Sequence, residues 1–248
     1  MRIIARLDIK QNTLIKSVLY DGVRKLGDPE IFANEYYCSE IDELLIVNNT
    51  GSLYNTKLDC ELLKKIRKKK ALPITAGGGI TSLDDAFQLI KSGSDKIVIN
   101  SLIHKNYSEA KKIVDALGSS SVVGAIQIEW CNSVSRQRED EVITFYEMAR
   151  EATNLSLKET LKKYLDLGVG EVLLTDVGRD GCYSGLNQGL LETLNEFKND
   201  FPLLIGGGFS NKEEIKKFKG VASGIVISSS FHYKKTKVSE VVKYTNSL

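Results

Sequence analysis

Short runs rich in β-branched residues alternate with longer amphipathic stretches from one end of the chain to the other. This alternation is typical of βαβ units joined into a parallel sheet. Eight runs are candidate strands, at residues 2 to 8, 42 to 48, 72 to 76, 95 to 100, 122 to 128, 171 to 176, 202 to 206 and 224 to 228. Eight strands separated by helices predict a (β/α)8 TIM barrel, and 248 residues suit one such barrel as a single domain, 1–248.

Charge and hydropathy exclude several classes of function. The 34 Lys and Arg residues nearly balance the 32 Asp and Glu residues and form no basic tail or stripe, so we expect no nucleic-acid partner. No apolar run approaches the roughly 20 residues of a membrane span, and the N-terminus becomes polar too soon for a signal peptide. We therefore expect a cytoplasmic protein without membrane contact.

The chain has four scattered cysteines, Cys38, Cys60, Cys131 and Cys182. They include no C-x-x-C pair, so neither a disulfide framework nor a metal site is expected, and no cofactor is implied. The two histidines, His104 and His232, do not lie at nucleophile–base spacing from any cysteine, which argues against a Cys–His glutaminase within this chain. Any ammonia that the protein uses must come from elsewhere.

Capping signals mark several helix starts. Asp28 followed by Pro29 supplies an N-cap and a favourable first helical residue. The segments Ser156–Glu159 and Ser210–Glu213 have the spacing of capping boxes, in which a hydroxyl and a carboxylate satisfy each other's backbone N–H groups. These signals fix where the helices follow the strands.

Two segments, residues 9 to 27 and 129 to 155, are too long for ordinary connections between a strand and a helix. Within the second, the charged run at 136 to 141 is expected to be a solvated turn. Structureless insertions of this length are usually functional loops, and in a barrel they would lie at the C-terminal ends of the strands, where catalytic residues gather.

An internal repeat predicts two half-barrels, at about 1–118 and 119–248. The segment from Pro73 aligns without gaps on the segment from Pro202, and every match is separated by the same 129 positions. The matches are Pro73 with Pro202, the Gly triplets 77–79 and 206–208, Ser101 with Ser230, and Lys105 with Lys234. Two copies of one βαβ module explain this regularity more simply than chance does.

Each copy carries the elements of a phosphate site. A Gly triplet between a strand and a helix lets backbone N–H groups approach an anion, which the positive helix end also favours. Donors follow at the next strand end, Asn100–Ser101 in one copy and Ser228 to Ser230 in the other. One triplet alone equally fits a flexible turn, but two copies in register favour a ligand with a phosphate at each end.

Period-2 alternation in the first strand places charge inside the barrel. Ile3, Ala5 and Leu7 form an apolar face that should meet the helices, and the opposite face holds Arg2, Ile4, Arg6 and Asp8. Interior charge is costly, so Asp8 is a candidate functional group, with a strand-end cap as the alternative. Asp180 lies past the sixth strand on the same rim and equally fits a turn residue.

Motifs occur along the whole chain. They are RLDIK at 6 to 10, Lys16, GDP at 27 to 29, DEL at 42 to 44, TAGGGI at 75 to 80, SGSDKIVIN at 92 to 100, GEVLLT at 170 to 175, RDG at 179 to 181 and SFH at 230 to 232. Together they resemble the cyclase subunit of imidazole glycerol phosphate synthase. The resemblance implies a barrel lyase in a heterodimer with a glutaminase subunit. Such a lyase passes ammonia through the barrel and uses it to cyclise and cleave a bisphosphorylated ribulosyl substrate.

The resemblance also implies roles for individual residues. Asp8 matches the catalytic carboxylate, Asp180 matches a substrate-side carboxylate, and Lys16 lies in the loop that closes the site. The two phosphate sites correspond to Gly79, Asn100 and Ser101, and to Gly207, Gly208, Ser228 and Ser229. The ring of two cations and two anions where ammonia enters corresponds to Arg2, Glu43, Lys96 and Glu171, which singly would be ordinary strand-start charges.

The chain departs from the family pattern at the centre of the site. The family's second catalytic Asp is Gln127, the Asp ending the second strand is Asn48, and the Cys beside the catalytic Asp is Arg6. Gln127 cannot titrate, whereas paired carboxylates let one group accept a proton while the other gives one. The pattern resembles the diverged second copies that accompany sugar amidation in surface-polysaccharide clusters, where ammonia converts an acetamido group to an acetamidino group.

Four hypotheses follow. The first is a synthase subunit of a glutamine amidotransferase complex that acts on a phosphorylated sugar-type acceptor. The second is the authentic cyclase of histidine biosynthesis, and the third is a non-catalytic ammonia conduit that activates a glutaminase. The fourth is the related sugar isomerase of the histidine pathway, which TDVGRDG at 175 to 181 also resembles, although the ring residues argue against it.

Overall fold

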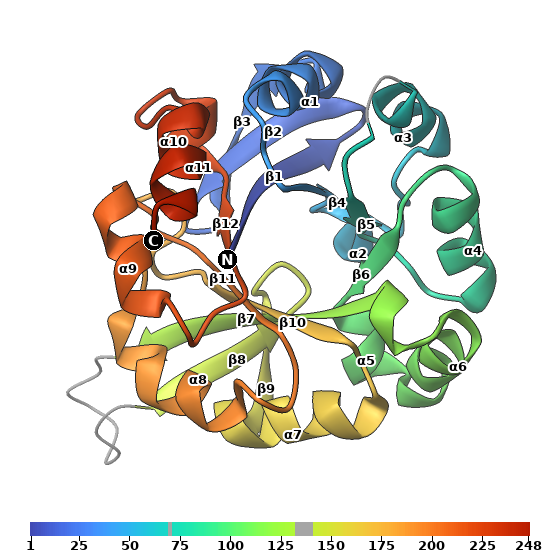
Figure 1. Cartoon of the computed structure of the whole chain (residues 1–248). Coiled ribbons are helices and arrows are strands. Elements are labelled where there is room, and N and C mark those ends of the chain that lie inside the picture. Colours follow the sequence, from blue (N-terminus) through green and yellow to red (C-terminus); the bar gives the residue numbers. More distant parts are fainter. Residues whose placement is uncertain (69–70, 132–140) are drawn as a thin grey trace.

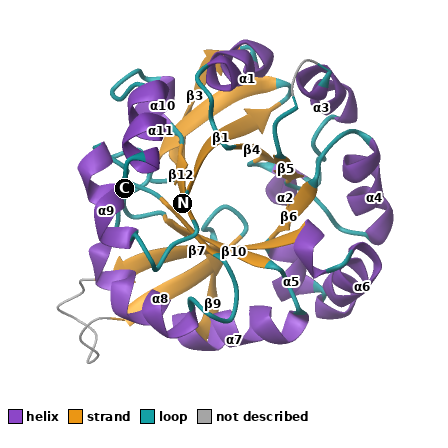
Figure 2. Ribbon diagram, viewed as in Figure 1, coloured by secondary structure: helices purple, strands orange, loops and turns teal. Residues whose placement is uncertain are grey.

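Eight parallel strands close into a barrel in the computed structural model, which describes residues 1–68, 71–131 and 141–248 (Figure 1). Around the barrel they are β1 (Arg2–Lys10), β4 (Glu43–Asn48), β5 (Ile74–Gly77), β6 (Lys96–Ile99), β7 (Val122–Cys131), β10 (Glu171–Asp176), β11 (Leu203–Gly206) and β12 (Gly224–Ile227). The last strand, β12, pairs with β1 and closes the ring. The helices surround the strands (Figure 2), so the predicted (β/α)8 barrel is confirmed.

The helices are α1 (Pro29–Cys38), α2 (Gly51–Tyr54), α3 (Cys60–Arg67), α4 (Leu83–Lys91), α5 (Ser101–Lys105), α6 (Tyr107–Leu117), α7 (Leu157–Leu167), α8 (Leu191–Phe197), α9 (Ile215–Phe218), α10 (Ser229–His232) and α11 (Val238–Asn246). Three short 3-10 segments are Ser119–Ser121, Gln188–Leu190 and Lys212–Glu214. Across the described parts of the chain, no helix has both the length and the apolar character needed to cross a membrane.

Two of the three predicted helix starts are confirmed, and the third is one residue off. Asp28 caps α1, and the Ser156–Glu159 capping box begins α7. The third box consists of Asn211 and Glu214 instead of Ser210 and Glu213. Glu214 is buried, and its other carboxylate oxygen accepts the Leu186 N–H at 2.7 Å, so a second segment fixes which glutamate faces the cap. Asn caps a helix as well as Ser does.

The apolar side chains form two layers on either side of the barrel wall. The predicted alternation in β1 is confirmed, because Ile3, Ala5 and Leu7 pack toward the helices while Ile4 points into the barrel. The interior layer consists of Ile4, Leu45, Val98, Val123, Leu173, Leu204 and Val226. Full burial of such a side chain contributes about 1.5–3 kcal/mol, enough to fix which face of each strand points inward.

After each of the barrel strands β1 and β7, the chain forms two further strands that pair as a hairpin. The strands β2 (Thr13–Val18) and β3 (Asp21–Gly27) follow β1, while β8 (Glu141–Tyr146) and β9 (Glu151–Ser156) follow β7, all antiparallel. The prediction of structureless loops was therefore wrong for the described residues of these segments, since ladder hydrogen bonds satisfy most of their backbone. The turn expected at 136 to 141 lies outside the described residues except for Glu141, which begins β8.

The register of the strands is consistent with the predicted half-barrel repeat. Asp8 pairs with Val47 on the next barrel strand, and Gln127 pairs with Thr175 in the same way. Asp8 and Gln127 therefore occupy equivalent positions in the two halves.

The gapless alignment needs one correction. Gly77 pairs with Val98 and Gly206 pairs with Val226, so the glycines are 129 positions apart but the valines only 128. One residue is missing from the second copy before β12. Ser101, the first residue of α5, is therefore equivalent to Ser229 of α10 rather than to Ser230.

Candidate functional site

Four charged side chains form a buried cluster where β1 emerges from the interior apolar layer. Arg6 Nε donates to Asp8 Oδ1 at 2.8 Å, and Lys16 Nζ lies 2.6 Å from Asp180 Oδ2 and 3.5 Å from Asp8 Oδ2. Lys16 reaches this position because β2 folds back over the barrel mouth. The structure thus brings together Asp8, Lys16 and Asp180, which the sequence singled out.

Asp8 and Lys16 are each held in the charged form. Burial raises the pKa of Asp8, but the Arg6 and Lys16 cations outweigh burial and hold that pKa below its usual value. Burial likewise lowers the pKa of Lys16, and the carboxylates of Asp180 and Asp8 outweigh it and raise that pKa. Asp8 is thus a weak proton acceptor because its charge is already matched.

Gln127 and Asn48, at positions where the resemblance implies carboxylates, serve local structure. Gln127 Oε1 accepts the Ala149 N–H at 2.7 Å and so holds the turn between β8 and β9. Asn48 Nδ2 donates to the Thr56 carbonyl at 3.2 Å, which secures the chain beyond α2. Neither amide side chain can transfer a proton as a carboxylate does.

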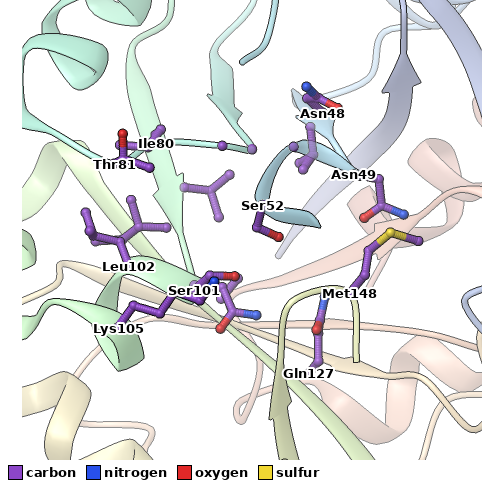
Figure 3. A pocket seen from close by; sticks show the side chains of 18 of the residues that line it. Asn48, Asn49, Ser52, Ile80, Thr81, Ser101, Leu102, Lys105, Gln127 and Met148 are labelled. Carbon is purple, nitrogen blue, oxygen red and sulfur yellow. The ribbon is translucent and has the colours of Figure 1, made fainter. Parts of the chain in front are cut away.

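The first predicted phosphate site borders a cavity of about 310 Å³ at the barrel mouth. Gly79, Asn100 and Ser101 line it, and Asn100 Oδ1 is buried without a hydrogen-bond partner among the described residues. Figure 3 shows Ser101 and Lys105 on one side of the cavity and Asn49, Met148 and Gln127 on the other. Gly79 has a φ of +77°, a conformation that places its backbone against the cavity and that few other residues adopt.

The second predicted phosphate site borders a much smaller space of about 20 Å³. Gly207, Gly208, Ser228 and Ser229 all line it, and Asp180 does as well. The hydroxyls of Ser228 and Ser229 are buried and have no hydrogen-bond partner within the described structure. Both sets of predicted donors therefore gather as expected, but the spaces that they border differ in size.

The four predicted ring residues form a closed set of ion pairs at the N-terminal ends of the strands. Arg2 Nη1 lies 2.6 Å from Glu43 Oε2, and Arg2 also bonds Glu171. Lys96 Nζ lies 3.3 Å from Glu43 Oε2 and 3.0 Å from Glu171 Oε2. The Arg2 and Lys96 side chains are 33% and 20% exposed, so the ring borders solvent at this end of the barrel.

Two residues of the site, Tyr20 and Asn49, were missed from the sequence. Tyr20, at the turn between β2 and β3, is buried above the Arg6 guanidinium, with 5.8 Å between the ring centroid and Arg6 Cζ. Asn49 Oδ1 accepts from Arg6 Nη2 at 3.3 Å. No sequence motif points to either residue, because their positions depend on how the hairpin and the β4 end fold over β1.

The two histidines occupy equivalent places behind the phosphate-site helices. His232 on α10 bonds the Tyr36 hydroxyl through Nδ1, and His104 on α5 lies 3.3 Å from the Tyr164 hydroxyl. Burial lowers the pKa of each imidazole to about 4, so both stay neutral near pH 7. Among the described residues, no group of three or more His, Cys, Asp and Glu side chains could hold a metal ion.

Comparisons with known proteins agree with this geometry. The family model described as "Histidine biosynthesis protein" matches residues 2–237. The imidazole glycerol phosphate synthase subunit HisF of Thermococcus onnurineus (strain NA1) is 33% identical over 244 residues, covering 98% of this chain and 94% of the relative. The subunit of that name from Legionella pneumophila is 35% identical over 214 residues, covering 86% and 98%. The one from Exiguobacterium sp. (strain ATCC BAA-1283 / AT1b) is 31% identical over 240 residues, covering 97% and 91%.

Proposed function

The chain belongs to the histidine biosynthesis protein family as a HisF-like barrel of the cyclase type, and from this premise we propose that it is the synthase subunit of a glutamine amidotransferase complex. A separate glutaminase subunit releases ammonia at the N-terminal end of the barrel. The ammonia reacts at the other end with a phosphorylated sugar-type acceptor. The reaction is the amidation of an acetamido group, in the synthesis of a surface polysaccharide.

The observation that carries this proposal is the ion pair between Arg6 and Asp8. A cyclase of this family, by the resemblance above, works with two carboxylates that exchange protons. Here one carboxylate is bound by Arg6 at 2.8 Å, and the equivalent position holds Gln127, whose oxygen is used by Ala149. The centre of the site is therefore poorly suited to the proton transfers of cyclisation.

The rest of the barrel supports ammonia handling. The ring of Arg2, Glu43, Lys96 and Glu171 surrounds the N-terminal opening, and the interior apolar layer lies between this ring and Arg6. An apolar layer admits neutral NH3 far more readily than NH4⁺, because moving an unpaired charge into it is costly. A ring that meets a glutaminase at this end would deliver ammonia in its reactive form.

The charged cluster suits addition to an amide carbonyl. When the ammonia nitrogen bonds the carbonyl carbon, negative charge develops on the oxygen, and the Arg6 and Lys16 cations lie where they can stabilise it. The attacking nitrogen loses two protons and the carbonyl oxygen gains two, so that the oxygen leaves as water and the carbon keeps two nitrogens as an amidine. Asp8 holds Arg6 in place and is a positioning residue in this scheme.

The test compares two acceptors with the purified protein and an ammonium salt, and then with glutamine and the glutaminase partner. We expect amidation of an acetamido sugar phosphate and little turnover of the bisphosphorylated histidine intermediate. Robust cyclisation of that intermediate would contradict the amidation proposal and support a role in histidine biosynthesis. Absence of ammonia-dependent turnover with any acceptor would remove the synthase proposal altogether.

A non-catalytic conduit is the second candidate, and the position of Lys16 favours it. Lys16 bridges Asp8 and Asp180, so each carboxylate of the cluster already has a cation as its partner. An Asp8→Asn variant separates the two candidates, because a conduit that only activates a glutaminase keeps both glutaminase activation and the downstream product. Loss of the product with glutaminase activation intact excludes the conduit.

A further inference from the structure

The two predicted phosphate sites border cavities of very different size. The first-half cavity measures about 310 Å³ and the second-half cavity about 20 Å³. Among the described residues, only Arg6 and Thr175 line both. The Arg6 side chain is tied to Asp8 on one side and to Asn49 on the other, so it separates the two cavities.

The second cavity is narrow, and Asp180, which lines it, is held in place by contacts with the first hairpin. Lys16 Nζ lies 2.6 Å from Asp180 Oδ2, and the Leu19 N–H donates to the Asp180 carbonyl at 2.8 Å. These contacts join the hairpin of β2 and β3 to the loop after β10. A space of about 20 Å³ holds about one water molecule, which can satisfy the Ser228 and Ser229 hydroxyls without a ligand. Asp180 also lines this space, and a carboxylate repels a phosphate.

The first cavity has the opposite character. Its charged lining residues in the described chain are the cations Arg6 and Lys105, and no carboxylate lines it. Its carboxamides are Asn48, Asn49, Asn55, Asn100, Asn106 and Gln127. Carboxamides donate and accept hydrogen bonds, as sugar hydroxyls and an acetamido group require. A volume of about 310 Å³ is at the lower end for ligand pockets, so it suits one sugar ring with one phosphate.

We propose that the acceptor carries a single phosphate, which binds at Gly79, Asn100 and Ser101, and that its sugar ring lies among the carboxamides toward Arg6. The second phosphate site stays closed by Lys16 and Asp180 while the acceptor is bound. This inference rests on the proposed function for the acceptor being a phosphorylated sugar. It adds the number of phosphates, the half of the barrel that binds them and the neutral polar surroundings of the ring.

Equilibrium binding to the full chain tests it by calorimetry, without ammonia or a glutaminase. The probes are N-acetylglucosamine 6-phosphate and N-acetylglucosamine 1,6-bisphosphate. If both sites held phosphate, the bisphosphate would bind about tenfold or more tightly than the monophosphate, because the second contact becomes intramolecular. We expect affinities within about threefold of each other, and one molecule bound per chain. A bisphosphate preference of about tenfold or more, or no binding of the monophosphate at millimolar concentration, overturns the inference.

Charge variants locate the phosphate. Ser101→Asp places a carboxylate in the first site and should weaken monophosphate binding about tenfold or more. Ser120→Asp adds the same charge at an exposed position in the 3-10 segment before β7, outside both cavities, and is the matched control. A loss confined to Ser229→Asp instead would place the phosphate in the second half and overturn the inference. Circular dichroism checks that each variant is folded.

The two proposals fail separately. Monophosphate binding without ammonia-dependent turnover contradicts the proposed function and leaves the single-phosphate site standing. Ammonia-dependent turnover with a strong preference for bisphosphates supports the proposed function and contradicts the single-phosphate site.

Discussion

Arg6 and Asp8 lie two residues apart on β1, and both side chains point into the barrel, where water cannot screen them. Their side chains are 10% and 2% exposed, so each depends on a partner of opposite charge. A buried pair adds little net stability when complete, but removing one partner leaves a charge that is expensive to bury. The pair therefore controls both the stability of the barrel mouth and the protonation of Asp8.

An Arg6→Met variant should show this as pH-dependent stability. The pKa of Asp8 is lowered in the folded protein, so its contribution is present above the unfolded pKa of about 3.9 and is lost as pH falls through the folded value. Without Arg6, only Lys16 opposes burial and that pKa rises, so we expect the free energy of unfolding at pH 7 to fall by about 3 kcal/mol. The loss should shrink toward pH 4, where Asp8 can accept a proton.

Urea denaturation at the two pH values measures the effect. Lys158→Met is the control, because it removes an exposed ion pair with Glu196 and should cost less than about 1 kcal/mol at either pH. An equal loss for Arg6→Met at both pH values would mean that packing, and not the charge of Asp8, accounts for it.

Restoring the family residues at the centre should restore part of the family chemistry. Gln127→Asp alone leaves Asp8 bound to Arg6, so we expect cyclisation of the bisphosphorylated histidine intermediate to stay at the low rate of the unchanged protein. The double variant Arg6→Cys with Gln127→Asp frees one carboxylate and adds the other, and its ammonium-dependent cyclisation should exceed that of the single variant about 10²-fold. Equal activity of the two variants would show that Arg6 is not what blocks the reaction.

The sequence predicts the strand-borne part of the site well, because strand alternation fixes which side chains point inward. Asp8 and the four ring residues follow from this rule together with the resemblance, and the structure brings the ring residues into contact. The sequence does not predict the Arg6–Asp8 ion pair or the position of Tyr20. Those contacts depend on side-chain rotamers and on how a hairpin folds over the mouth, which period and propensity do not encode.

The two hairpins, β2 with β3 and β8 with β9, are the strands that lie outside the eight-stranded barrel. The tip of one packs against the tip of the other, with Tyr20, Met148 and Val177 forming a small buried cluster. Both segments read as loops in the sequence, since pairing with a distant strand end leaves no periodic signal in a short segment. The eight barrel strands, in contrast, were predicted to within a few residues because each is a short apolar run.

The Tyr20 hydroxyl is expected to lower the stability of the protein while it contributes to acceptor binding. Its hydroxyl is buried beside the first cavity without a partner in the described structure, and an unsatisfied buried hydroxyl costs about 1–3 kcal/mol. Tyr20→Phe should therefore raise the free energy of unfolding by about 1 kcal/mol and weaken acceptor binding. Tyr36→Phe is the matched control, because that hydroxyl bonds His232 and its loss should destabilise the protein by about 1 kcal/mol. Thermal denaturation that shows both variants destabilised would contradict the assignment.

At the scale of the whole molecule, an apolar layer inside the barrel separates two groups of charged side chains. Charged groups form a ring at one end and a cluster at the other, and the seven interior apolar residues lie between them. Each half of the barrel carries a set of predicted phosphate donors, but the cavity beside the second set is much smaller than the cavity beside the first.

The ring predicts a selective defect. Glu171→Gln removes one of its two anions and leaves Arg2 and Lys96 with Glu43 alone. We expect glutamine-dependent turnover to fall about tenfold, and turnover with an ammonium salt to change less than about twofold, since the synthase site itself is untouched. Lys111→Ala, which breaks an exposed ion pair with Asp115 on α6, is the control and should alter neither rate. Equal losses in both assays would contradict a role at the ammonia entrance.

Passage of ammonia inside the barrel is the central claim, and nitrogen isotopes test it most directly. The complex with its glutaminase receives amide-labelled ¹⁵N-glutamine, an acceptor that supports turnover, and unlabelled ammonium in large excess. If ammonia passes through the barrel, most of the nitrogen added to the product carries ¹⁵N, because ammonia released at the ring reaches the acceptor before it mixes with solvent. Product labelled only in the proportion of the bulk ammonium pool would contradict passage through the barrel.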